Sequence, residues 1–152
     1  MGTPLGEVYE LFMHLVNDYR LQDLVEFSPE DFETYLEPWL IFAIAEFSGI
    51  CDQPLTYDKT TKTFDNELSL ENKVILAKLM LKYWYEKVIN DITQMNLHVE
   101  GRGFNISSEA LNLREKKEYL NAMKEECSQM LTDYSHKKIN WGNWYSQMFS
   151  WG

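Results

Sequence analysis

The sequence predicts an all-α protein, because apolar residues recur at helical spacing in four separate stretches. The expected helices cover about residues 5–24, 29–47, 69–92 and 108–138. A polar stretch at 51–68 separates the second helix from the third. Of the 152 residues, 45% are hydrophobic, which is enough apolar surface for one domain with its own core. We therefore expect a helical domain at 1–138, followed at 139–152 by an extended aromatic arm.

The first two helices are predicted by an amphipathic stripe and by a start signal. Across 5–24, apolar side chains repeat at spacings of three and four, which places them on one face of a helix. Ser28 followed by Pro29 is typical of a helix start, because serine caps free N–H groups and proline fits the first turn. Pro38 lacks an N–H group, so we expect the helix at 29–47 to be kinked there or split in two.

The polar stretch and the third helix follow from a change of composition. Residues 51–68 have no helical period and predict a loop or a short hairpin, with the polar residues 59–61 at an exposed tip. Ser69 is a candidate cap for the helix at 69–92, where apolar residues cover more than half of the circumference. We expect this helix, with Trp84, to lie at the centre of the core.

The last helix is predicted by a heptad pattern. After an irregular stretch expected at 96–107, apolar residues recur every seven positions with methionines interleaved. The residues of this seam are Leu113, Leu120, Cys127 and Tyr134, with Met123 and Met130 between them. Acidic and basic residues balance along 108–138, so the opposite face is expected to be solvated.

The residues with catalytic or metal-binding side chains do not form a recognisable motif. His14, His98 and His136 fall in different predicted segments, and no metal-ligand spacing joins them. Cys51 and Cys127 form no CxxC pair, and no neighbouring histidine in sequence would activate either thiol. Cys127 is better explained as a small core residue. We therefore expect no enzyme activity, no metal and no cofactor.

The charge is strongly acidic, with a net value of −10. Such a surface repels phosphate backbones, so sequence-specific nucleic-acid binding is not expected. The acids at 26–48 face no basic residue in that stretch; they are Glu26, Glu30, Asp31, Glu33, Glu37 and Glu46. We interpret these acids as a solvated polar face. The alternative is that the chain is a small acidic inhibitor that imitates DNA and binds a basic host protein. The longest apolar run, 38–45, is too short to span a bilayer, and we expect neither membrane association nor an export signal.

The C-terminal arm at 139–152 has no charged residue and is rich in aromatic ones. The candidate partner-binding residues are Trp141, Trp144, Tyr145, Phe149 and Trp151. One interpretation is that the arm folds back and completes its own core. We favour docking into another protein, because tryptophan and tyrosine anchor interfaces and because charged residues at 136–138 separate the arm from the helical domain.

The order of these features resembles the head-tail connector proteins, also called adaptor or neck proteins, of long-tailed bacteriophages. The most specific parts are ILAKLMLKYWYEKVIND at 75–91 and FNISS at 104–108, within a resemblance that covers about 5–138. The family implies a structural virion protein that forms a ring, typically of twelve copies, between the portal protein and a tail-side neck or stopper protein. DNA passes through the ring without sequence-specific binding, as in DNA ejection.

The same resemblance implies where the chain is made and what its arm does. Such proteins are made in the host bacterial cytoplasm and reside in the neck of the virion. Their C-terminal segment commonly inserts into the portal, a role that maps onto the aromatic residues of 139–152.

Overall fold

The computed structural model describes residues 2–16, 28–100 and 107–138. They contain the helices α1 (Leu5–Leu15), α3 (Pro29–Phe47), α4 (Leu70–Glu100) and α5 (Ser107–Lys138). A small antiparallel hairpin joins α3 to α4, formed by β1 (Tyr57–Asp58) and β2 (Thr63–Phe64). The fold is mainly helical, as the sequence predicted.

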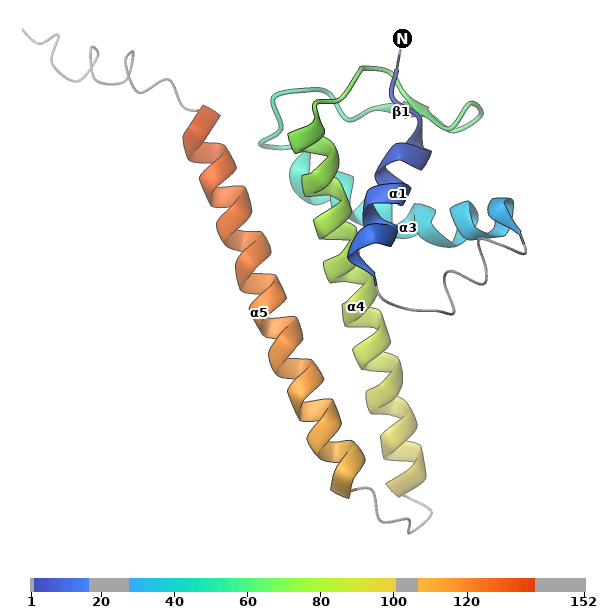
Figure 1. Cartoon of the computed structure of the whole chain (residues 1–152), viewed down its shortest axis with the longest axis vertical. Coiled ribbons are helices and arrows are strands. Elements are labelled where there is room, and N and C mark those ends of the chain that lie inside the picture. The colour runs from blue at the N-terminus through green and yellow to red at the C-terminus, as the bar shows by residue number, and fades with distance from the viewer. Residues whose placement is uncertain (1, 17–27, 101–106, 139–152) are drawn as a thin grey trace, which may run out of the picture.

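Helix α4 is the centre of the fold (Figure 1). It contacts each of the other three described helices, α1 and α3 near its N-terminal half and α5 alongside it. Helices α4 and α5 form a long pair, while α3 crosses α4 and the hairpin lies beside the start of α4. The expected central position of the third helix is therefore confirmed.

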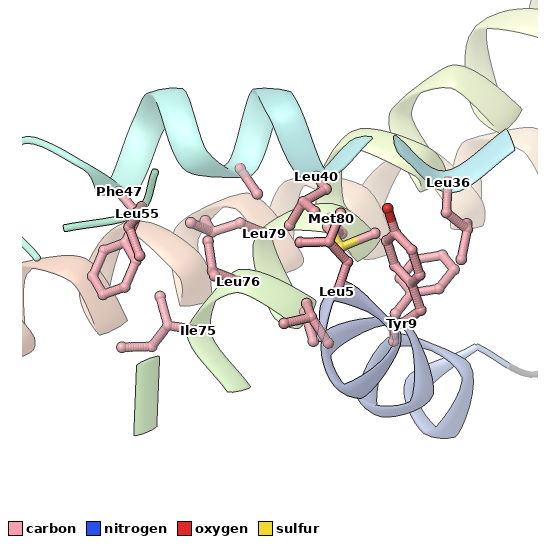
Figure 2. Close-up of a cluster of buried hydrophobic side chains, with 14 of the residues drawn as sticks. Leu5, Tyr9, Leu36, Leu40, Phe47, Leu55, Ile75, Leu76, Leu79 and Met80 are labelled. Carbon is pink, nitrogen blue, oxygen red and sulfur yellow. The ribbon is translucent and has the colours of Figure 1, made fainter. Parts of the chain in front are cut away.

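The core lies where α1, α3 and α4 meet (Figure 2). Leu36, Leu40 and Phe47 of α3 are fully buried, because their spacing puts them on one helix face. In Figure 2, Leu40 lies beside Leu79 and Met80 of α4, while Leu36 lies beside Tyr9 of α1. Trp84 also belongs to this core, with 7% of its surface exposed. Its ring meets that of Phe12 edge to face at 6.1 Å, and its indole N–H donates to the hydroxyl of Tyr35 at 3.1 Å.

The hairpin is held by the N-terminal residues. Phe64 donates its N–H to the carbonyl of Thr3 at 2.7 Å, and its side chain is buried in the core. A side chain at Gly2 would overlap the carbonyl oxygen of Phe64, so this close approach requires glycine. At the tip, Asp58 accepts hydrogen bonds from the N–H groups of Thr60 and Thr61, and residues 59–61 are exposed as expected.

Two helix ends differ from the sequence expectation. Helix α1 ends at Leu15, because Val16 is extended, and the rest of the helix predicted to 24, residues 17–24, lies outside the described residues. Helix α4 continues through 96–100, where an irregular stretch was expected, because this segment has no glycine or proline until Gly101. The rest of that stretch, 101–106, lies outside the described residues.

The predictions for Pro38 and for the two candidate cap residues, Ser28 and Ser69, had different outcomes. Helix α3 is continuous through Pro38, which is exposed together with Thr34, so the missing backbone hydrogen bond lies on the solvent side. Ser69 accepts a hydrogen bond from the N–H of Asn72 at 3.2 Å and acts as a cap. Ser28 occupies the cap position of α3, but its side chain makes no cap hydrogen bond.

No helix in the described segments is long and apolar enough to cross a membrane.

Candidate docking surfaces

The aromatic arm predicted as the partner-binding site lies outside the described residues. This holds for every candidate residue in it, namely Trp141, Trp144, Tyr145, Phe149 and Trp151. The candidate docking surfaces described below are therefore those of the described helices.

A groove of about 760 Å³ runs between the start of α4 and the end of α5. We call it the α4–α5 groove; it is lined by Leu70, Glu71, Val74, Ile75, Lys78, Glu126, Gln129, Met130, Asp133, Tyr134 and Lys137. Its floor is apolar, and Leu70 has 66% of its surface exposed although it is a large aliphatic residue. The volume falls within the range of roughly 300–1,000 Å³ that is typical of pockets that bind ligands.

Charged residues of both signs form the rim of the groove. At one end, Lys137 pairs with Glu71 at 3.2 Å and so links the last turn of α5 to the first turn of α4. Gln129 donates a hydrogen bond to Asp133 at 2.8 Å along the outer edge. An apolar floor with a polar rim is the usual composition of a surface that binds another chain segment.

Tyr134 fixes the end of α5 against the loop that follows α3. Its hydroxyl donates to the carboxylate of Asp52 at 2.6 Å and accepts from the N–H of Asp52 at 3.0 Å. Its ring meets Phe47 edge to face at 5.0 Å. Burial, and then the hydrogen bond to the carboxylate, raise the pKa of this phenol well above its ordinary value. The position of the groove wall is thus set by a buried, hydrogen-bonded residue.

A second apolar surface lies on the outer side of α3 and was not foreseen from the sequence. We call it the α3 aromatic face; it comprises Tyr35, Trp39 and Phe42, with Tyr83 of α4 beside Phe42. Phe42 is 48% exposed, and its ring lies 5.6 Å from that of Tyr83. The spacing of positions 35, 39 and 42 was the available signal, because it places aromatic residues on one face of the helix.

The acidic run does not form one continuous charged row. Glu37 pairs with Lys62 at 2.9 Å and accepts a hydrogen bond from Tyr57 at 3.2 Å. The hydrogen bond from Lys62 lowers the pKa of Glu37 below its ordinary value.

Of the other acids in 26–48, one makes tertiary contacts and three are exposed. Glu46 contacts Lys82 at 2.6 Å and accepts a hydrogen bond from Tyr83 at 2.7 Å. Burial, and then this hydrogen bond, raise the pKa of Tyr83 to about 12. Glu30, Asp31 and Glu33 are exposed at the start of α3, whereas Glu26 lies outside the described residues. A solvated face was expected, but two of the acids make tertiary contacts.

The cysteines and histidines are also placed apart. Cys127 is buried in the core, as predicted for a seam residue, and burial raises the pKa of its thiol. His14 and His136 are exposed on different helices, and the side chain of His98 lies outside the described residues. Within the parts of the chain that the structure describes, no group of three or more His, Cys, Asp or Glu residues could hold a metal ion.

No protein-family model, curated protein or solved structure matches the chain.

Proposed function

We propose that the chain is a structural subunit of a bacteriophage neck. In this role it assembles into a ring, typically of twelve copies, between the portal protein and a tail-side neck or stopper protein. DNA passes through the ring without being recognised. The aromatic arm at 139–152 anchors the subunit to the portal.

The observation that carries this proposal is the amount of apolar surface left exposed on well-packed helices. The α3 aromatic face and the α4–α5 groove lie on different parts of the molecule; Phe42 is 48% exposed on the first, and Leu70 is 66% exposed in the second. Monomeric proteins rarely expose contiguous apolar patches without a binding role. Two such surfaces fit a subunit that has neighbours on more than one side.

The charge of the chain agrees with a passage for DNA. A conduit lined with lysine and arginine would gain affinity by releasing counterions from the duplex and would hold it in place. A net charge of −10 per copy avoids this, and the exposed acids Glu30, Asp31 and Glu33 lie together at one end of α3. The assignment to the neck itself depends on the sequence resemblance over 5–138.

The alternative of a DNA-mimicking inhibitor receives less support. A mimic needs carboxylates that are free and spaced along a rigid face like phosphates. Glu37 and Glu46 instead pair with Lys62 and Lys82, which removes two acids of the run from such a row. The connector is therefore the better proposal.

The direct test mixes the purified chain with the portal ring encoded by the same genome and measures the mass of the complex by size-exclusion chromatography with light scattering. We expect binding in ring stoichiometry. A variant in which Trp141, Trp144 and Trp151 are replaced by alanine should lose binding, because aromatic anchors supply most of the energy of such contacts.

The matched control is Tyr119→Ala, which removes an aromatic residue that is 59% exposed outside the arm. It should bind the portal like the original chain. Absence of portal binding by the original chain, or unchanged binding by the tryptophan variant, would contradict the proposal. Capture of a basic host protein in place of the portal would favour the inhibitor.

A further inference from the structure

The α4–α5 groove ends where the aromatic arm begins. Lys137, which lines the groove, is the second-last residue of α5, and the chain continues from Lys138 to residue 152. Along α5, the lining residues from 126 to 137 span roughly 17 Å, at about 1.5 Å per residue. A segment as long as 139–152 reaches roughly 45 Å when extended, so it can reverse direction and still cover the groove.

The composition of the arm matches the groove floor. Residues 139–152 carry no charge and five aromatic side chains, so placing them on Leu70, Val74 and Met130 would desolvate no ionised group of the arm, while the charged residues of the rim can stay at the edge of the contact. Asn140, Gly142 and Asn143, directly after the helix, are residue types that favour a turn. The sequence thus provides a reversal followed by an apolar segment.

Because the arm is covalently joined to the chain that forms the groove, the groove binds this arm in preference to that of a second copy. A segment joined to its binding site by a short linker has an effective concentration in the millimolar range. An arm from a second copy at ordinary micromolar concentration would therefore be outcompeted by the arm of the same chain.

We propose that, in the isolated subunit, residues 139–152 fold back and lie in the α4–α5 groove of their own chain. The groove is then the resting site of the arm, and it shields the exposed Leu70 until a partner takes the arm up. This deepens the proposed function, in which the same segment binds the portal, but docking in the groove itself requires no portal.

Hydrogen exchange followed by mass spectrometry on the full chain tests this inference. We expect amides in 143–152 to exchange about tenfold or more slowly than an unstructured peptide of the same sequence. The protection should not change when the protein is diluted a hundredfold, because docking within one chain does not depend on concentration. Exchange at the unstructured rate, or protection lost on dilution, would overturn the proposal; the second result would indicate a neighbouring copy.

Leu70→Glu is the variant that places a charge in the groove. The residue is mostly exposed and opens α4, where an acidic side chain is compatible with the helix dipole, so the fold should persist. Protection of 143–152 should fall toward the unstructured rate. Ile41→Glu is the matched control: it makes the same type of change at an exposed position of α3, outside the groove, and protection should remain.

Portal binding separates this inference from the proposed function. Leu70→Glu should bind the portal at least as tightly as the original chain, because its arm is already released. If portal binding depends on the arm while the arm is never protected in the free chain, the connector proposal stands and the groove proposal fails. Protection that survives Leu70→Glu would also overturn the groove proposal.

Discussion

The body formed by α1, α3 and the first half of α4 differs sharply from α5 in how it is held. Fully buried side chains from three helices and the hairpin interlock in the body, as Leu36, Leu76 and Phe64 illustrate. Among residues 113–137 of α5, whose burial the structure describes, the buried residues form one row with members seven residues apart; these are Leu120, Cys127 and Tyr134. The body is thus packed from several directions, whereas α5 is attached along one line.

The difference explains why the groove lies beside α5. A helix held along a single row leaves the flanks of that row open, and ion pairs at its edges add little stability because they are solvated. The pairs of Lys124 with Glu86 and of Lys137 with Glu71 are of this kind. The helix that is attached along a single row is therefore also one that borders a candidate docking surface.

The largest effect is expected from Trp84→Ala in the body. The substitution removes a nearly buried ring, its contact with Phe12 and its hydrogen bond to Tyr35. It should lower the free energy of unfolding by about 3–5 kcal/mol. Urea unfolding followed by circular dichroism measures this; unchanged stability would show that α4 does not organise the core.

Leu120→Ala tests the attachment of α5 and should cost less, about 2–3 kcal/mol, because the residue packs from one side. Hydrogen exchange should speed up along α5 while α1 and α3 keep their protection. An equal loss of protection in all helices would show that α5 and the body unfold as one unit.

Tyr134→Phe should have a smaller effect, about 1–2 kcal/mol, since it removes the hydrogen bond to Asp52 and keeps the ring against Phe47. Thermal unfolding compares it with Tyr119→Phe, an exposed position where no change is expected. Equal melting temperatures for the two variants would show that the bond to Asp52 does not hold the end of α5.

The smallest effect concerns pH. Because the pKa of Glu37 is lowered in the folded chain, its pairing with Lys62 stabilises the fold above the carboxyl's unfolded pKa and is lost as the pH falls through the folded pKa. Glu37→Gln should therefore flatten the decline in melting temperature between about pH 5 and pH 3. Glu30→Gln, at an exposed position, should leave that decline as it is.

Local patterns were enough to predict the fold class. Helical periodicity located the four helices, and the serine at 69 and the polar tip at 59–61 were correctly interpreted because they depend on neighbours in sequence. The end of α1 at Leu15 was missed because no glycine or proline marks it in the sequence, and the extension of α4 to Glu100 was missed although no such breaker interrupts that segment.

The surfaces were harder to predict because they depend on which faces the core leaves uncovered. The pairs of Glu37 with Lys62 and of Glu46 with Lys82 join residues far apart in sequence, and no spacing rule finds them. The α3 aromatic face was visible as a stripe, but a stripe alone does not say whether it faces the core or solvent. The arm residues stay a prediction.

Thermal unfolding of a chain ending at Lys138 tests the central claim most directly, namely that the helical body is complete and that 139–152 serves a partner. Within the described residues, which end at 138, the buried cluster extends as far as Tyr134. If the arm serves a partner, the shortened chain should keep its helical circular dichroism and unfold in one cooperative transition. Loss of that transition would mean that the arm belongs to the core and would contradict its assignment as a docking segment.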